Sequence, residues 1–481
     1  MANILFIQNN YFHWLGPMWI SAVLKRHGHQ ARLVTAFSEA QVRRAVRRRR
    51  PDLVAMHTLT GAHRFSLGAA AAAKEALPGV KVILGGTHAT FFPEIVEEPG
   101  VDFVCRGEGE YAMLDLCNRL DSGGPVDDIA NIWAKIDGRI AKNDVRPLIE
   151  DLDGLPFPDR ELYLEGRAQP LRIAYFMAGR GCPHRCTICF NEKNMELYRG
   201  KGHYVRMRSP ENVIAEIEEV RRRYNNSTVR FEDDTFTLKR DWSRAFMDQY
   251  QSRVGLPFFI GTRADTLDQE MTTHLRQAGC YMAAFSVESG CERVRNGILR
   301  KDISTASLRQ AAELLHGAGI PFQTTNILGI PGETVEEGLM TVNLNIEIKT
   351  DNPWFSVFQP YPSTSIEETV KKEWGLTNLH PDMISDNYHS WSLLNHDPQV
   401  RQLSNLHKFT YWTIKHPGLL PLVKLLIKLP PNPAFIAIHR AGHMFVYSHG
   451  ARLSTWRGFY DGMKVSLSSP FFQMLEKFQG R

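Results

Sequence analysis

Short apolar runs alternate with helical patterns along most of the chain, and this alternation restricts the possible folds more than any other feature. Within residues 3 to about 125, helical patterns such as Met18–His27 and Leu67–Glu75 separate the apolar runs. The runs that fit strands are Asn3–Gln8, Leu53–Met56, Val80–Leu84 and Phe103–Cys105. Strands separated by helices at this spacing predict a parallel, doubly wound α/β sheet. Such sheets bind ligands at the carboxyl ends of their strands.

A second alternating series runs from about Arg172 to Gln359. Its six strand candidates are Ile173–Met177, Thr228–Phe231, Phe258–Gly261, Met282–Val287, Phe322–Leu328 and Phe355–Phe358. Six successive β–α units predict a partial (β/α)6 TIM-like barrel, whose chemistry is expected at the strand carboxyl ends.

The sequence therefore predicts four parts. Residues 1–126 form the first α/β domain, and 127–165 form a hairpin, turning at Asp137-Gly138, and a linker. Residues 166–364 form the barrel. Residues 365–481 form a mainly helical C-terminal domain, which we expect to supply substrate specificity.

Composition is that of a globular protein of several domains, because 481 residues exceed the usual size of a single core. The net charge of +5 is small, and no nucleic-acid partner is expected. The basic run Arg47–Arg50 fits the solvated end of a surface helix, with phosphate binding as the alternative. No signal peptide is recognised at the N-terminus, so a cytoplasmic location is expected.

The stretch Leu419–Ile427 is very apolar, but Lys424 and Lys428 fall on one helical face and Pro430-Pro431 ends it. It is too short to span a bilayer. We expect a packing helix of the C-terminal domain. An interfacial helix, which would make the protein peripheral to a membrane, is the alternative.

Three cysteines, Cys182, Cys186 and Cys189, lie close together directly after the first strand of the second series. Three thiolates in one short loop can hold three corners of a cubane iron–sulfur cluster and leave the fourth iron open. A structural zinc site would need four closed ligands, and His184, inside the run, is badly placed to be the fourth. The scattered cysteines are expected to be structural thiols: Cys105, Cys117, Cys280 and Cys291.

This Cys-x3-Cys-x2-Cys run after a barrel strand resembles that of the radical S-adenosylmethionine (SAM) superfamily. The resemblance implies a [4Fe-4S] cluster on Cys182, Cys186 and Cys189, which cleaves SAM to a 5′-deoxyadenosyl radical. It also implies an electron donor such as flavodoxin or ferredoxin.

Turns after later strands resemble the SAM-facing positions of the same family. The segment Phe231–Phe236 stands where many family members carry Gly-Gly-Glu, and it lacks the glycines. Its carboxylates, Asp233 and Asp234, could accept hydrogen bonds from the SAM amino group. The alternative is that these acidic residues form the N-cap of a helix. Arg263 suits the SAM carboxylate, and Glu288 suits the ribose or the amino group. The residues that the resemblance assigns to SAM are Ile188, Phe190, Asp233, Asp234, Arg263, Glu288, Ser289 and Gly329.

The first domain has no Gly-x-Gly-x-x-Gly after its first strand, which argues against a dinucleotide site. Its turns at 85–90 and 106–110, and the order of domains, resemble the cobalamin (B12)-dependent branch of radical SAM proteins, in which a Rossmann-like domain binds cobalamin. The branch includes class B methyltransferases and anaerobic magnesium-protoporphyrin ester cyclases. The residues implied at the cobalamin are His13, Gly16, His57, Thr58, Gly85, Gly86, Thr87, His88, Gly107 and Glu108.

His13 has two interpretations. The family motif that supplies a lower cobalt ligand is Asp-x-His-x-x-Gly, and this chain keeps His13 and Gly16 but has Tyr11 where the aspartate would stand. Because that aspartate normally orients the imidazole, a role in lining the loop is favoured over cobalt ligation.

The resemblance implies a methyltransferase, in which the radical removes a substrate hydrogen and methylcobalamin supplies a methyl group to a small molecule or lipid. A cobalamin-dependent cyclase, oxidase or rearrangement enzyme remains open. A tRNA-modifying enzyme is less favoured, since the extra N-terminal cysteines of methylthiotransferases have no counterpart here. A non-catalytic cobalamin sensor would leave the barrel turns unexplained.

Overall fold

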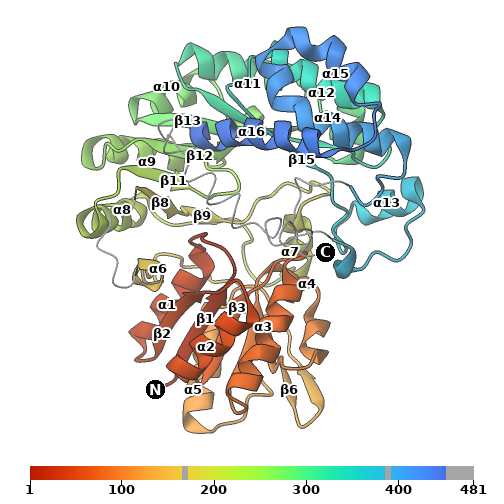
Figure 1. Cartoon of the computed structure of the whole chain (residues 1–481). Coiled ribbons are helices and arrows are strands. Elements are labelled where there is room, and N and C mark those ends of the chain that lie inside the picture. Colours follow the sequence, from red (N-terminus) through yellow and green to blue (C-terminus); the bar gives the residue numbers. More distant parts are fainter. Residues whose placement is uncertain (165–171, 385–391, 451–481) are drawn as a thin grey trace. The chain divides into compact units, whose positions relative to one another are not determined.

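The computed structural model describes residues 1–164, 172–384 and 392–450. The first residues expected for the barrel, 166–171, and the end of the C-terminal domain, 451–481, lie outside the described residues. The chain forms two compact units (Figure 1). The first comprises Met1–Gln169 and Lys193–Arg206; the second comprises Pro170–Glu192 and Met207–Arg481.

The first unit contains a seven-stranded sheet in the order β2-β1-β3-β4-β5-β6-β7. Its strands are β1 Asn3–Gln8, β2 Gln30–Thr35, β3 Leu53–His57, β4 Lys81–Gly85, β5 Phe103–Cys105, β6 Ile132–Ile136 and β7 Arg139–Lys142. The first five strands are parallel, which confirms the doubly wound α/β fold. The hairpin β6–β7 adds to this sheet in antiparallel pairing, through a turn at Asp137 and Gly138 that both have positive φ.

Strand β2 was not predicted from the sequence. It lies at the edge of the sheet, and only Ala31 of its six residues is buried. An edge strand exposed on this scale has no continuous apolar run, so the pattern that reveals a buried parallel strand is missing.

Helices cover both faces of the first sheet. Helices α1 (Leu15–Arg26) and α5 (Glu110–Ser122) contact each other, as do α2 (Glu39–Arg49) and α3 (His63–Ala76). One core lies between the sheet and the α2–α3 pair. The shorter elements are α4 Thr87–Phe91, η1 Pro93–Glu97 and α6 Glu161–Leu164. The arginine run is the end of α2, closed by Arg50 in the left-handed conformation.

The segment 193–206 is held against the first unit by residues expected to touch cobalamin. Glu108 forms a buried ion pair with Arg206 at 2.9 Å and accepts a hydrogen bond from the Ile149 N–H. At Gly107 (φ +71°) an added Cβ would lie 1.7 Å from the Tyr198 hydroxyl. Gly107 and Glu108 therefore hold the chain's own segment, and their contact with cobalamin stays a prediction.

The second unit contains a six-stranded parallel sheet in the order β15-β14-β13-β12-β11-β8. Its strands are β8 Ile173–Phe176, β11 Thr228–Phe231, β12 Phe258–Thr262, β13 Cys280–Glu288, β14 Phe322–Leu328 and β15 Asn352–Val357. Two short strands, β9 Gly179–Arg180 and β10 Arg206–Met207, pair separately. The sheet confirms the partial (β/α)6 barrel.

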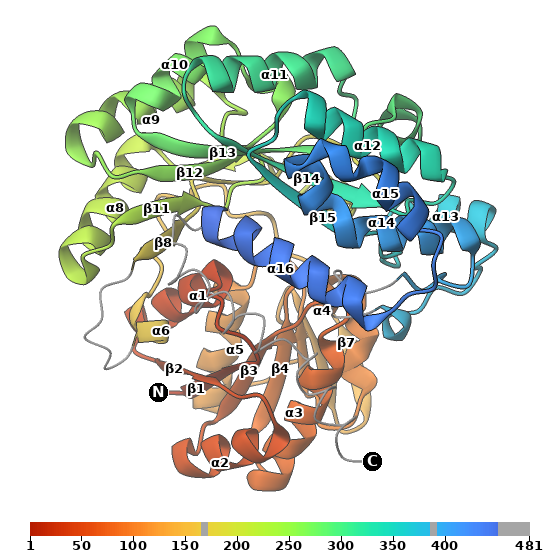
Figure 2. The ribbon, with the colours of Figure 1, turned by 45° about the horizontal axis from the view of Figure 1, so that its top comes forward.

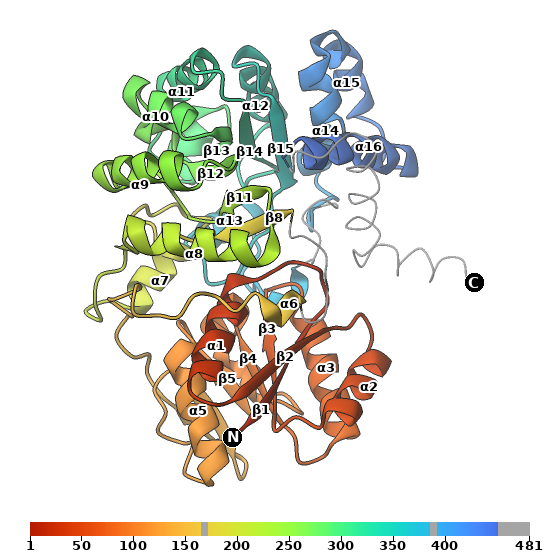
Figure 3. The same ribbon diagram turned by 90° about the vertical axis from the view of Figure 1, so that its left-hand side faces the viewer.

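Five helices follow one another along one face of this sheet (Figure 3). They are α8 Pro210–Tyr224, α9 Arg240–Arg253, α10 Gln269–Gln277, α11 Thr305–Gly317 and α12 Val335–Glu347. Ser209 caps α8 ahead of Pro210, and Thr334 with Glu337 forms a capping box on α12. The remaining elements of this part are η2 Ala264–Thr266 and the π-helix η3 Arg293–Ile298. Helix α7 (Phe190–Leu197) begins in the second unit and continues into the first, since the boundary falls between Glu192 and Lys193.

The C-terminal elements are α13 Glu367–Trp374, η4 Pro381–Met383, α14 Pro398–Lys415, η5 Pro417–Leu419, α15 Leu420–Leu426 and α16 Pro433–Gly450. Two of them, α14 and α16, contact the edge strand β15 (Figure 2). Helix α14 packs on α12 and β15, and Val423 and Ile427 join the core around it. The apolar stretch is therefore a packing helix on that side. In the described parts, no helix has the length and apolar character needed to cross a bilayer.

Substitution Glu108→Ala should lower the free energy of unfolding of the first unit by about 3 kcal/mol, because it leaves the buried Arg206 guanidinium without its negatively charged partner and with only the Ile149 carbonyl as acceptor. Urea unfolding measures this loss. The matched control is Asp128→Ala, which breaks the exposed pair with Arg119 and should cost less than about 1 kcal/mol. Equal losses in the two variants would contradict the structural role of Glu108.

Candidate functional site

The three clustered cysteines lie in one loop that begins after β9 at the carboxyl end of the barrel sheet. All three thiols are partly exposed and free of disulfides. Among the described residues, no group of three His, Cys, Asp or Glu side chains is close enough to hold a single metal ion. In an iron–sulfur cluster each thiolate binds a different iron, so the three thiols need not converge on one point.

Asp233, after β11, fixes the start of this loop. Its carboxylate accepts hydrogen bonds from the backbone N–H groups of Ala178 (3.0 Å) and Gly179 (2.7 Å). Desolvation raises the pKa of Asp233 to about 7, against the opposing effect of those two bonds. Asp233 therefore holds the backbone that leads into the loop, and its contact with SAM stays a prediction. Asp234, which is exposed, is hydrogen-bonded by the Asn191 side chain.

A second contact fixes the middle of the loop. The N–H of Thr187 donates to the carbonyl oxygen of Leu299 at 3.0 Å, and its hydroxyl donates to that of Ile298 at 2.9 Å. The carbonyl of Thr187 accepts from the N–H of Ile366. Sequence reasoning missed Thr187, since a lone threonine between two cysteines carries no periodic signal.

Two cations lie near the thiols. Arg263 and Lys301 are both buried, and their charges lower the pKa of Cys186 against the larger effect of burial, which raises it. Arg263 makes a bidentate pair with Asp265 (3.0 and 2.9 Å), and Lys301 lies 3.4 Å from Glu288, whose φ is +58°. The predicted SAM residues Arg263 and Glu288 are therefore each paired within the protein.

Burial raises the pKa of all three cluster thiols, that of Cys189 to about 11. The Asn191 N–H donates to Cys189 Sγ at 3.4 Å and acts in the opposite direction. Free thiols with raised pKa values are protonated at neutral pH. Because thiolates are the ligand form, metal binding at this loop is expected to release protons.

A cavity of about 180 Å³ opens beside Ile188 at the carboxyl ends of β14 and β15. Its lining residues are Ile188, Ile327, Ser356, Val357, Phe358, Gln359, Tyr361, Thr364 and Ile366. Gln359 is 5% exposed, and neither polar atom of its side chain has a hydrogen-bond partner in the described structure. A buried amide without a partner is costly, so a ligand group is expected there. Phe190 lies edge-on to Tyr361.

Sequence reasoning missed Gln359, because the apolar pattern of β15 ends before it. The only local signal is the polar residue directly after a strand at the catalytic edge of a barrel. That signal is shared by many loop residues.

The turn after β14 is held by Glu333, which is buried. One oxygen of its carboxyl group accepts from the N–H groups of Gly329 (2.7 Å) and Ile330 (3.2 Å). Burial raises the pKa of Glu333 to about 8. Gly329 has φ +80°, so this turn requires glycine.

Ser289 serves the backbone after β13. It is completely buried, and its hydroxyl accepts from the N–H of Cys291 at 3.2 Å. At the next residue, Gly290, a Cβ would lie 2.4 Å from the Met340 carbonyl oxygen of α12. Ser289 therefore belongs to the close packing of this turn on α12.

In the first unit, the predicted residues after β3 and β4 form one hydrogen-bonded turn. The Thr58 N–H donates to the Gly85 carbonyl, and the Thr58 carbonyl accepts from the N–H of His88. Gly86 has φ +92°, and a Cβ there would lie 2.4 Å from the His57 ring. Burial lowers the pKa of His57 to about 4, so this imidazole is neutral at pH 7.

The remaining predicted cobalamin residues of the first unit differ in their burial and in their contacts. His88 is buried, stacks on His63 and bonds to Thr60, while Thr87 begins α4. At Gly85 a Cβ would make only ordinary contacts, and Gly16, near the start of α1, has open space around it. His13 stacks on Tyr163 at 4.7 Å. The His13 ring thus packs on a residue of α6 in the same unit.

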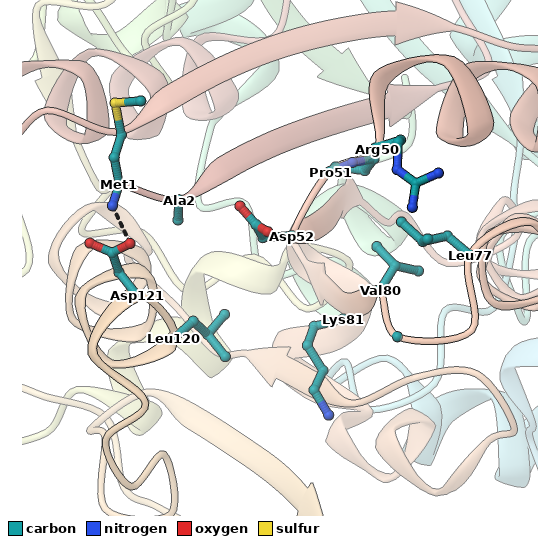
Figure 4. Close-up of a pocket in the computed structure, with 11 residues that line it drawn as sticks. Met1, Ala2, Arg50, Pro51, Asp52, Leu77, Val80, Lys81, Leu120 and Asp121 are labelled. Atoms are coloured by element: carbon teal, nitrogen blue, oxygen red, sulfur yellow. Dashed lines mark hydrogen bonds and ion pairs between the residues drawn. The ribbon is translucent and has the colours of Figure 1, made fainter.

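A depression of about 590 Å³ lies at the opposite, amino-terminal edge of the same sheet (Figure 4). Asp52 and Lys81 line it, as do Met1 and Asp121, which form an ion pair. It holds both signs of charge and none of the predicted site residues. It is therefore separate from the candidate site.

Comparison with known families matches both units. Residues 8–116 match the B12 binding domain, and residues 177–344 match the radical SAM superfamily. The chain is a radical SAM enzyme with a B12 binding domain. The matched regions contain the cysteine loop, the strand-end turns and the Gly86 turn described above.

Relatives with different activities resemble this radical SAM enzyme. An uncharacterised methyltransferase of Pyrococcus horikoshii is 27% identical, over 74% of this chain and 77% of its own. An anaerobic magnesium-protoporphyrin IX monomethyl ester cyclase of Rubrivivax gelatinosus is 26% identical, over 76% and 69%. The fold is similar to that of the radical SAM methyltransferase TsrM of Kitasatospora setae, solved with tryptophan and a SAM analogue (TM-score 0.64, 16% identity, 79% and 78% covered).

Substitution Cys186→Ala should remove nearly all iron from the anaerobically reconstituted protein, because two thiolates cannot hold three corners of a cluster. Iron and sulfide analysis with visible absorption measures this. Cys117→Ala, which alters a buried thiol of the first unit, is the control and should retain full iron. Full iron in the Cys186 variant would exclude Cys186 as a ligand.

Substitution Gln359→Leu should raise the Kd for SAM about tenfold, because it removes the buried amide from the cavity beside Ile188 while keeping its volume. Equilibrium binding to reconstituted protein measures the change. Iron content should stay the same, and S-adenosylhomocysteine, which carries the same adenosine, should lose affinity equally. An unchanged Kd would remove Gln359 from the SAM site.

Proposed function

We propose that the protein is a cobalamin-dependent radical SAM methyltransferase acting on a small molecule or lipid. The observation that carries the proposal is that one chain contains both a B12 binding domain and a radical SAM barrel. In the barrel, the cysteine loop adjoins a cavity in which the buried side-chain amide of Gln359 has no hydrogen-bond partner in the described structure. An electron donor such as flavodoxin or ferredoxin belongs to the proposal.

The bound cofactors would supply the chemistry: cluster and SAM a carbon radical, cobalamin a transferable methyl group. The protein's own part is to hold and orient them. Cys182, Cys186 and Cys189 would bind the cluster. Their loop is held in place by the carboxylate of Asp233 and the backbone contacts of Thr187.

The cavity beside Ile188 would take the adenine of SAM. Apolar side chains such as Ile327 and Val357 would make van der Waals contacts with the ring faces. The Gln359 amide offers both a hydrogen-bond donor and an acceptor to a heterocycle. Arg263 and Lys301, which are paired with Asp265 and Glu288, lie near enough to the loop for their charges to lower the pKa of Cys186. They would place a positive field beside the negatively charged cluster without needing to bind SAM directly.

The first unit would hold cobalamin at the carboxyl ends of β1, β3 and β4. Gly86 allows the backbone a conformation that other residues rarely adopt, and the open space at Gly16 leaves room for a ligand. His57 is neutral and His13 is packed on Tyr163, so we propose lining roles for both and assign no protein ligand to cobalt.

Methyl transfer is supported by the Pyrococcus relative and by the fold of TsrM, whereas the cyclase from Rubrivivax supports a second candidate. That candidate uses the same two cofactors for cyclisation or oxidation without methyl transfer. The two differ in what SAM donates: a methyltransferase takes its methyl group from SAM, and a cyclase only its adenosyl radical.

The test follows a labelled methyl group from SAM to cobalamin in anaerobically reconstituted protein. A methyltransferase should show the label on bound cobalamin before any substrate is added, as well as 5′-deoxyadenosine under strong reduction. Mass spectrometry measures both. Cobalamin that stays unlabelled while 5′-deoxyadenosine forms would overturn methyl transfer and favour the cyclase, and failure to bind cobalamin would overturn both.

A further inference from the structure

Three leucines in and after α15 point away from the core. Leu422, Leu425 and Leu429 are 52%, 64% and 47% exposed. Two backbone bonds, from the N–H of Lys428 to Leu425 and from the N–H of Leu429 to Leu426, add a 3₁₀-type turn after α15. Spacings of three and four residues then bring the three leucines to one side. Isolated exposed leucines are common, but an aligned row of three is not.

The opposite face of the same helix packs against the rest of the protein. Val423 and Ile427, four residues apart, are almost completely buried against α14. Helix α15 therefore has two apolar faces, and only one of them is used by the fold.

An apolar groove of about 320 Å³ continues the exposed face toward α16. It is lined entirely by apolar side chains: Phe409, Trp412, Leu419, Leu422, Val423, Leu426, Ile438 and Ala441. Phe445, further along α16, is 38% exposed. The outer sides of α15 and α16 thus form one apolar surface, which we call the α15–α16 face.

Positive charge borders this face. Lys424 and Lys428 are exposed, lie four residues apart beside the leucine row, and make no ion pair with any described residue. Residues 398–450 contain six Lys and Arg and no Asp or Glu. Residues 398–481 hold 11 Lys and Arg against two Asp and Glu, so this part has a formal charge of +9 while the rest of the chain has −4.

We infer that the α15–α16 face docks on an anionic lipid membrane. An apolar row flanked by lysines on a short helix lets leucines enter the acyl boundary while the amines remain at the phosphate level. The absence of carboxylates removes repulsion from acidic headgroups. RNA would use the lysines but gives no reason for the leucine row, and a second copy of the chain would use the leucines but would bring like charges together.

The test is sedimentation of the full-length protein with vesicles of phosphatidylcholine alone and of phosphatidylcholine mixed with phosphatidylglycerol. Binding should require phosphatidylglycerol and weaken in high salt. Lys424→Gln with Lys428→Gln should lower the partition coefficient about 25-fold, at about fivefold per lysine. Leu422→Ser, Leu425→Ser and Leu429→Ser together should lower it at least about tenfold, because they remove apolar burial.

Matched controls carry the same kinds of change elsewhere on the second unit. Lys371→Gln with Lys372→Gln alters a lysine pair on α13, and Met340→Ser alters an apolar side chain of α12 that is 46% exposed. Both should bind vesicles like the unchanged protein. Thermal melting and iron content should match in all variants, since every altered side chain is exposed.

Three results would overturn the inference. They are no binding to vesicles of either composition, equal binding by the leucine variant, and a leucine-dependent dimer in sedimentation velocity with unchanged vesicle binding. Lysine-dependent binding of RNA without vesicle binding would assign the surface to RNA instead. None of these readouts depends on methyl transfer, so the proposed function stands or falls separately.

Discussion

The bonds from Ala178 and Gly179 to the carboxylate of Asp233 are the constraint on which the catalytic edge of the barrel depends. The segment that leads to the three cysteines leaves the six-stranded sheet after β8, so bonds of that sheet no longer hold it. One carboxylate from the neighbouring strand end satisfies the two N–H groups that the loop exposes as it departs. Thr187 then ties the middle of the loop to residues 298–299.

Charges around this loop are arranged in pairs. Arg263 is balanced by Asp265, and Lys301 by Glu288, so two buried cations stay near the thiols at a tolerable desolvation cost. Because their partners belong to the protein itself, the two cations are held in place by the fold. In the first unit, Glu108 and Arg206 use the same device to hold a segment that follows the cysteine loop in sequence.

Much of the fold could be predicted from the sequence, because buried parallel strands read as continuous apolar runs. β1 and β14 were predicted with the bounds that the structure has. The exposed edge strand β2 was missed for the same reason, since it has no such run. The cysteine loop was recognised by spacing alone. Gln359 could not be recognised in this way, because it is a candidate site residue only through the cavity that β14, β15 and two loops form around it.

The sequence by itself determined the two α/β domains and the three thiols, since periodicity and ligand spacing are local properties of the chain. Tertiary structure decided which polar residues are committed internally: Asp233 to backbone, Arg263 to Asp265, Glu108 to Arg206. It also decided that α15 has a second, unused apolar face. The physical reason is that pairing and burial depend on neighbours distant in sequence. The type of a residue therefore limits which groups it can bind, and the fold decides which of them it contacts.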